Sequence, residues 1–138
     1  MDHDKRIDKS VPFVAVNIAV LTVSDSRSLD DDRSGDVLVG RVADDGHNLA
    51  DRRIVTDDFD AITAIVKNWV DDASVDVVIP TGGTGVTVWA GTPEVCRSIF
   101  ENEIEGFGGI WRDVSFPKIG TYTVKARAVA GVDCATSL

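Results

Sequence analysis

The sequence predicts an α/β protein in which a mostly parallel central sheet is covered by helices on both faces, forming a three-layer sandwich. Three segments rich in β-branched residues alternate along the chain with three segments of helical periodicity. The apolar run at 13–25 is nearly continuous, which is typical of a strand buried on both faces. Crossovers between successive strands should be right-handed, so we expect the strands to pair in parallel.

The first part of the chain supplies a strand, a helix and a second strand. The segment "FVAVNIAVLTVSD" (13–25) predicts the first strand, which stops at a polar loop. Residues 34–47 place apolar side chains on one helical face, with Ser34 as the expected N-cap and Gly46 as the expected end. The segment "NLADRRIVTDD" (48–58) predicts a second strand that ends in an acidic pair.

The middle of the chain repeats this order. Residues 60–73 have apolar residues at helical spacing, with Asp60 as the expected N-cap and Trp69 as a core residue. Residues 75–80 predict the third strand. The tripeptide "TPE" is typical of a helix start, so we expect Thr92 to cap a third helix.

The last part of the chain is less regular. Residues 105–116 predict a glycine-punctuated turn that leads into a short helix, whereas 120–132 fits either a helix or a strand. Phe107 and Trp111 lie among glycines, so they fit either an aromatic wall for a flat ligand or core packing. Core packing is the interpretation that we favour.

The composition indicates one globular domain, expected over 13–138 and preceded by a flexible tail at 1–12. The chain has 14 Lys and Arg against 23 Asp and Glu, a net charge of −9, which disfavours nucleic acid and anionic membranes as partners. The sequence has no apolar run of the ~18 residues that cross a bilayer, and its first residues lack a signal-peptide pattern. We therefore expect a cytoplasmic protein in which Cys96 and Cys134 are reduced.

Polar residues follow each of the three predicted strands. Ser24 and Asp25 follow the first strand, Asp57 and Asp58 end the second, and the segment Thr81 to Gly85 follows the third. In a parallel sheet the three strand ends lie at one edge, where ligands bind in open α/β sheets. The sequence therefore predicts a binding site at this edge.

The glycine segment "TGGTG" fits two interpretations. Glycines adopt positive φ and let backbone N–H groups converge on an anion, so a phosphate-binding loop is one of them. A tight structural turn is the other. Neither the lysine of the common phosphate-binding loop nor the glycine spacing of the dinucleotide fingerprint is present in it.

The aspartates at the strand ends also leave two interpretations open. Asp25, Asp57 and Asp58 are hard oxygen ligands of the kind that hold Mg²⁺ beside substrate phosphates. In an Asp-rich chain they are also typical loop acids and helix N-caps. On pattern alone, the second interpretation is favoured.

Taken in order, several motifs resemble the MoaB/MogA family of molybdenum-cofactor biosynthesis proteins, and its MoaB branch in particular. They are "LTVSDSR", "DDRSGDVL", "RIVTDD", "VIPTGGTG" with "TPE", "EIEGFGGIWRDVSF", "IGT" and "RAVAGV", and they cover roughly 14–132. The gephyrin G domain is a relative. The resemblance implies the molybdopterin-binding fold, assembled as a trimer or as a hexamer made of two trimers.

The resemblance also implies binding of molybdopterin and, in active members, transfer of AMP from Mg²⁺-ATP to its terminal phosphate with release of pyrophosphate. The implied partners are molybdopterin, the nucleotide and other proteins of cofactor biosynthesis. Asp57 matches an acid tied to activity and is the tentative metal ligand, with Asp58 as a second catalytic candidate. The implied phosphate and pterin residues are Ser24, Asp25, Ser34, Gly35, Thr81, Gly82, Gly83, Thr84, Gly85, Glu105, Gly106, Phe107, Gly108, Ser115, Gly120, Thr121 and Arg127.

Departures from the family pattern leave the activity open. Active members carry an Arg-Asp pair two residues before "TPE", whereas this chain has Trp89-Ala90, and Glu105 replaces a usual proline. Relatives also continue into another strand and a "PGSP"-type loop, which we expect this chain to lack. An adenylyltransferase, a molybdopterin-binding protein with little or no turnover, and an oligomer without a ligand are the three hypotheses. The intact "TGGTG" and "EGFGG" segments disfavour the last.

Overall fold

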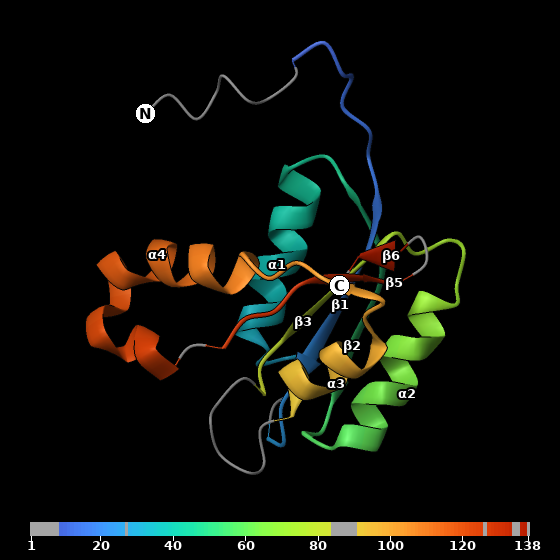
Figure 1. The fold of residues 1–138 in the computed structure, drawn as a ribbon. Helices are drawn as coiled ribbons and strands as arrows, with labels where there is room; N and C mark the ends of the chain where they lie inside the picture. Colours follow the sequence, from blue (N-terminus) through green and yellow to red (C-terminus); the bar gives the residue numbers. More distant parts are fainter. Residues whose placement is uncertain (1–8, 27, 84–90, 126, 134–135, 138) are drawn as a thin grey trace.

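The computed structural model describes residues 9–26, 28–83, 91–125, 127–133 and 136–137. The elements follow one another as β1 (Asn17–Val23), α1 (Arg33–Asp44), β2 (Asn48–Val55), α2 (Phe59–Val70), β3 (Val77–Thr81), α3 (Thr92–Ile99), β4 (Asn102–Glu103), α4 (Phe107–Ile119), the 3₁₀ helix η2 (Gly120–Lys125), β5 (Gly131–Asp133) and β6 (Thr136–Ser137). Figure 1 shows the sheet with α1 on one side and α2 and α3 on the other. The predicted α/β class is confirmed.

The strands form one sheet in the order β2-β1-β3-β6-β5-β4. The pairs β1–β2, β1–β3 and β3–β6 are parallel, whereas β4–β5 and β5–β6 are antiparallel. The segment 120–132, left open between helix and strand, contains η2 and the start of β5. The sheet is therefore parallel in its first half, as predicted, and antiparallel in its last.

Strand β1 lies at the centre of the core, and its side chains alternate between two faces of the sheet. Ala19, Leu21 and Val23 pack with residues of α2, α3 and β3 in the larger apolar cluster. Ile18 and Val20 pack on the other face with Val42 and other residues of α1. This alternation explains why the sequence of β1 is nearly continuous in apolar residues.

Helix caps are the main local difference from the sequence-based expectations. Helix α1 is capped by Asp32, whose side chain accepts from the Gly35 N–H, and not by Ser34. Helix α2 is capped by Asp58, and not by Asp60, because the Asp58 carboxylate accepts from the Ala61 N–H. Each cap lies two residues before the expected one.

Helix α3 also differs at its start. Its N-cap is Gly91, and Thr92 is already the first helical residue. No side chain of the described residues caps it. Cys96 in this helix is a free, buried thiol, and burial raises its pKa to about 11. Cys134 lies outside the described residues. Trp69 in α2 is a core residue, as predicted.

Helix α4 is far less buried than the other helices. Of its 13 residues, Gly108 is the buried one. The helix lies to one side of the sheet and contacts chiefly η2 (Figure 1). Phe107 and Trp111 remain 40% and 49% exposed, so the favoured core interpretation of these two aromatics is wrong for the isolated chain. Their rings stack on each other instead, with centroids 6.4 Å apart.

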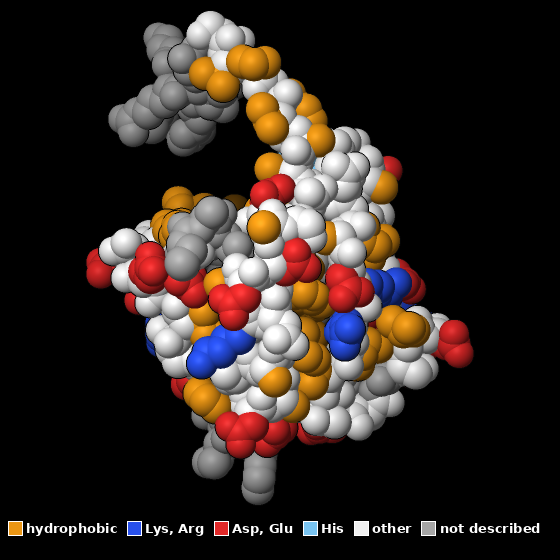
Figure 2. Space-filling view, turned by 90° about the vertical axis from the view of Figure 1, so that its right-hand side faces the viewer, with side chains coloured by type: hydrophobic (Ala, Val, Ile, Leu, Met, Phe, Trp, Pro, Cys, Tyr) orange, Lys and Arg blue, Asp and Glu red, His pale blue; other side chains and the backbone are white. Residues whose placement is uncertain are grey.

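The segment before β1 leaves the body of the molecule, and Figure 2 shows apolar side chains along it. Val11, Phe13 and Val14 are exposed, although the Phe13 ring also contacts His47. Acidic side chains are spread over the body in the same view, in keeping with the net charge of −9. In the part of the chain that the structure describes, no helix combines the length and the apolar character needed to span a membrane.

Candidate binding site at the strand ends

The carboxyl ends of β1, β2 and β3 lie side by side. The register pairs Val23 of β1 with Val55 of β2, and Thr22 of β1 with Thr81 of β3. Just beyond the strands, Ser24 donates from its N–H to the Val55 carbonyl at 2.8 Å. The predicted convergence of the three strand ends is therefore confirmed by the register of the sheet.

The glycine turn after β3 is packed against β1. Gly82 has φ +90° and Gly83 has φ +62°, conformations that only glycine adopts readily. A Cβ on Gly82 would overlap the Val23 carbonyl oxygen, and one on Gly83 would overlap the Thr92 hydroxyl. Both glycines are therefore required by backbone conformation and by space.

The rest of the glycine segment cannot be placed in the same way. Thr84 and Gly85 lie outside the described residues, as do Trp89 and Ala90. Thr81 is half-buried at the end of β3. The description resumes at Gly91, directly before α3.

Asp57 and Asp25 connect this turn to the other two strand ends. The Asp57 N–H donates to Asp25 Oδ1 at 2.9 Å, and Asp57 Oδ1 accepts from the Gly91 N–H at 3.2 Å. Asp58 instead points to its own helix, where Oδ2 accepts from the Ala61 N–H at 2.9 Å. Of the three aspartates proposed for a metal, two share the strand-end cluster and the third caps α2.

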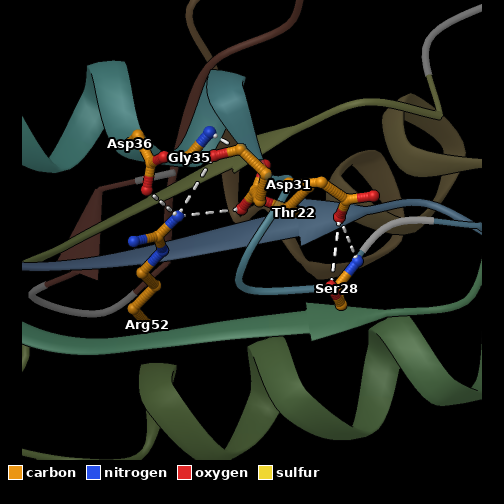
Figure 3. A network of polar contacts seen from close by, with 7 residues as sticks. Thr22, Ser28, Asp31, Gly35, Asp36 and Arg52 are labelled. Atoms are coloured by element: carbon orange, nitrogen blue, oxygen red, sulfur yellow. Dashed lines mark hydrogen bonds and ion pairs between the residues drawn. The ribbon is translucent and has the colours of Figure 1, made fainter.

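A buried ionic network supports the site from the α1 side (Figure 3). The fully buried Asp32 accepts from Thr22 Oγ1 at 2.6 Å and from the Gly35 N–H at 3.0 Å. Arg52 of β2 reaches over β1 and pairs with both Asp32, at 3.2 Å, and Asp36, at 2.7 Å. The network thereby joins β1, β2 and the start of α1.

The pKa of Asp32 reflects opposing effects. Burial by itself raises it, but the hydrogen bonds from Thr22 and Gly35, and the Arg52 guanidinium, outweigh burial and lower the pKa below its ordinary value. Asp32 is therefore ionised in the folded protein at neutral pH.

The two residues of the family motif "SG" at the start of α1 differ in burial. Gly35 is buried, and a Cβ there would overlap the Asp32 carboxylate. Ser34 is exposed on the first turn of the helix. Asp32 was missed by the sequence analysis, although aspartate is among the residues preferred at an N-cap and Asp32 lies directly before the helical segment.

Arg127 lies against the start of α3. Its guanidinium forms a bidentate ion pair with the Glu94 carboxylate. Nη1 pairs with Oε1, and Nη2 donates to Oε2 at 3.1 Å. The Arg127 hydrogen bond lowers the pKa of Glu94. Glu94 is thus committed to Arg127 and is not a free carboxylate beside the glycine turn.

The remaining pterin-side candidates lie on α4 and η2, away from the strand-end cluster. Glu105 and Gly106 are exposed before the helix, whereas Gly108 is buried where a Cβ would meet the Ala128 carbonyl oxygen at 2.8 Å. Ser115 is half-buried on α4, and η2 carries Gly120, with φ +60°, and the exposed Thr121. The chain at Arg127–Ala128 runs between the two groups, since it touches α3 on one side and α4 on the other.

The described residues contain no group of three or more His, Cys, Asp or Glu side chains arranged for a metal ion. One buried polar atom at the strand-end cluster stands out. The Thr92 hydroxyl has no hydrogen-bond partner within the described part of the chain and faces Gly83.

Fold and site together define an α/β protein with a glycine turn and two linked carboxylates at the carboxyl edge of a parallel sheet. Residues 19–133 match the protein family described as "Probable molybdopterin binding domain". The chain belongs to the MoaB family of molybdenum cofactor biosynthesis proteins.

Individual relatives agree with this assignment. The molybdenum cofactor biosynthesis protein B of Escherichia coli K12 is 44% identical over 123 residues, which cover 89% of this chain and 72% of the relative. The protein of the same name from Staphylococcus aureus MRSA252 is 41% identical over 84% of this chain and 70% of its own length.

Solved structures give the same result. A crystal structure of molybdenum cofactor biosynthesis protein B superimposes with a TM-score of 0.86 at 32% identity, covering 90% of this chain and 78% of the other. The tungsten cofactor synthesizing protein MoaB of Pyrococcus furiosus gives 0.72 at 30% identity, covering 87% and 74%.

Proposed function

We propose that this protein binds molybdopterin at the strand-end cluster and adenylylates it with Mg²⁺-ATP. In this reaction an oxygen of the terminal phosphate of molybdopterin attacks the α-phosphorus of ATP, and the bond to pyrophosphate breaks. The observation that carries the proposal is the meeting of the glycine turn at 82–83 with Asp25 and Asp57 at one edge of the sheet.

The glycine turn supports phosphate binding. Gly82 and Gly83 both have positive φ and form a turn, and backbone N–H groups of turns can line an anion-binding concavity. Such a turn needs no side-chain charge to hold an anion. This matters in a protein of net charge −9, where long-range attraction for a phosphate is absent.

The carboxylates fit a magnesium ion in part. Asp57 uses one oxygen for the Gly91 N–H, yet a carboxylate has about four lone-pair sites, so it can also bind a cation. Mg²⁺ usually takes one or two carboxylates together with substrate phosphates, and Asp57 offers one carboxylate beside the glycine turn. Bound there, the ion would neutralise charge on the transferring phosphoryl group.

A second function is favoured by one feature of the sequence. Trp89-Ala90 stand where active members of the family carry Arg-Asp, and Glu94, the nearest carboxylate in the described chain after them, is committed to Arg127. The alternative is therefore a protein that binds molybdopterin with little or no adenylyl transfer. Loss of one such charged group costs about 10²–10³ in rate.

The experiment that separates the two is pyrophosphate release from Mg²⁺-ATP and molybdopterin, with molybdopterin affinity measured in parallel. We expect the parent to turn over, and Asp57→Asn to lose about 10²–10³ in rate. If the parent binds molybdopterin but only the Ala90→Asp variant releases pyrophosphate, the protein is a molybdopterin-binding protein and not an adenylyltransferase. Absence of molybdopterin binding by both proteins would refute the proposal.

The proposal includes a homo-oligomer, a trimer or a hexamer. It is supported by α4, on which Ile110, Trp111, Val114 and Phe116 are all about half exposed or more. Light scattering at several concentrations tests it, with Ile110→Asp expected to lower the mass and Lys118→Asp on the same helix as the control. A monomeric mass for the parent at high concentration would contradict it.

The proposal also places the protein in the cytoplasm, with other proteins of molybdenum-cofactor biosynthesis as its partners.

A further inference from the structure

Asp25, Asp57 and Gly91 form a chain of hydrogen bonds that crosses three segments far apart in the sequence. Asp25 Oδ1 accepts from the Asp57 N–H at 2.9 Å, and Asp57 Oδ1 accepts from the Gly91 N–H at 3.2 Å. The chain therefore runs from the end of β1, through the end of β2, to the start of α3. Each bond joins a carboxylate to a backbone amide.

The far end of this chain is also tied to the glycine turn. The Thr92 N–H donates to the Gly83 carbonyl at 3.1 Å, so the turn and the helix start lie in contact. A Cβ on Gly83 would lie 3.4 Å from Asp57 Oδ1, which places this carboxylate oxygen beside the turn as well as beside Gly91. Asp57 thus lies beside both the turn and the helix start, where these two segments meet.

The Asp57 carboxylate contacts the backbone directly before α3. The first amides of a helix have no acceptor within the helix, and they carry its positive partial charge. Among the described residues, no side chain caps helix α3, its Thr92 N–H goes to the Gly83 carbonyl, and Pro93 has no N–H. Asp57 is the carboxylate that meets the Gly91 N–H directly before this helix.

We propose that Asp25 is a positioning residue for the binding site: its carboxylate holds the Asp57 backbone, and Asp57 in turn holds the start of α3 against the glycine turn. Asp25 acts in this role as a hydrogen-bond acceptor and not as a charge. The effect on ligand binding rests on the proposed function, whereas the effect on the Asp57 and Gly91 amides does not.

The chemistry of the acceptor makes the role testable. Asp25→Asn keeps an oxygen at Oδ1 and removes the charge, whereas Asp25→Ala removes both. Asp30→Ala is a matched control, because Asp30 is an exposed aspartate in the same loop between β1 and α1. Circular dichroism establishes that each variant keeps the fold.

The first readout is amide hydrogen exchange followed by NMR at Asp57 and Gly91. We expect both amides to be protected in the parent, in Asp25→Asn and in Asp30→Ala, and protection to fall about tenfold in Asp25→Ala, the effect of one hydrogen bond. Unprotected amides in the parent would overturn the inference. Equal protection in Asp25→Ala and the parent would do so too.

The second readout is molybdopterin affinity together with KM and kcat. Asp25→Ala should weaken binding and raise KM about tenfold, and Asp25→Asn should restore both. Equal loss in the Ala and Asn variants would mean that Asp25 acts through its charge, which overturns the positioning role. If the parent binds no molybdopterin, the proposed function fails, and amide exchange alone decides the role of Asp25.

Discussion

Strand β1 and helix α4 are both rich in apolar residues, yet the structure buries one and exposes the other. Six of the seven residues of β1 are buried, and its neighbours are β2 and β3 at its sides and helices on both faces. Helix α4 has one buried residue, Gly108, and contacts chiefly η2. Apolar composition alone therefore does not decide burial within one chain.

The difference lies in how the apolar residues are arranged. In β1 they alternate toward two covered faces, so every side chain has a partner within the domain. In α4, Ile110, Trp111 and Val114 lie within about one helical turn, and the described elements leave all three exposed. The two apolar clusters of the described chain thus form without α4, whose apolar side chains remain exposed.

The sharpest test of whether α4 lies outside the core is a pair of identical substitutions, one in the buried helix α2 and one in α4. Ile62 of α2 is fully buried, whereas Ile110 of α4 is 65% exposed. Ile62→Ala should lower the free energy of unfolding by about 2–5 kcal/mol, and Ile110→Ala by no more than ~0.5 kcal/mol. Urea unfolding at low protein concentration measures both. Equal losses would show that α4 is packed in solution.

The second-largest effect on the free energy of unfolding should come from the ionic network at the start of α1. Asp32→Ala removes the N-cap and the acceptor of the Thr22 hydroxyl, so we expect a loss of about 2–3 kcal/mol. Asp36→Ala, which removes the exposed partner of Arg52, should cost less than ~1 kcal/mol. Similar losses in the two variants would contradict a structural role for the buried carboxylate.

A smaller effect is expected from pH. The pKa of Asp32 is lower in the folded protein than in the unfolded chain, so its charge stabilises the fold above the unfolded value of ~3.9. This stabilisation is lost as the pH falls through the folded pKa. The stability advantage of the parent over Asp32→Asn should therefore be constant from pH 7 to about 4 and shrink below it. An advantage that persists unchanged at pH 2 would refute the assignment.

The smallest effect on the free energy of unfolding should come from the antiparallel half of the sheet. Arg97 of α3 and Glu103 of β4 form an exposed ion pair at 3.1 Å. Glu103→Gln should change the free energy of unfolding by no more than ~0.5 kcal/mol. A double-mutant cycle with Arg97→Gln measures the pair itself, and a coupling above ~1 kcal/mol would mean that this half is more tightly held than its exposure indicates.

The course of the fold could be predicted because its signals are local. The apolar run of β1 and the helical spacing of α2 fix the type of each element before any partner is known. The sequence alone could not show which of several neighbouring polar residues is the N-cap of a helix. Asp32 rather than Ser34 caps α1 because Thr22 and Arg52, from two strands, hold its carboxylate in place.

The candidate site was predictable only as a location. Parallel strands place Asp25 and Asp57 at one edge, which follows from topology. The bond from Asp57 to Gly91 depends on the position of α3, and the pairing of Glu94 with Arg127 depends on the return of the chain from α4. Contacts of this kind join segments more than thirty residues apart, and no local pattern encodes them.

The pairing of β3 with β6 has a consequence for biosynthesis of the chain. Val77 pairs with Ser137, sixty positions later, so β3 leaves the ribosome with one side free of a neighbour. At about 5–20 residues per second, translation takes ~3–12 s to supply the missing strand. During that interval the nascent chain exposes an unpaired edge, and capture of the edge by a second nascent chain competes with correct closure of the sheet.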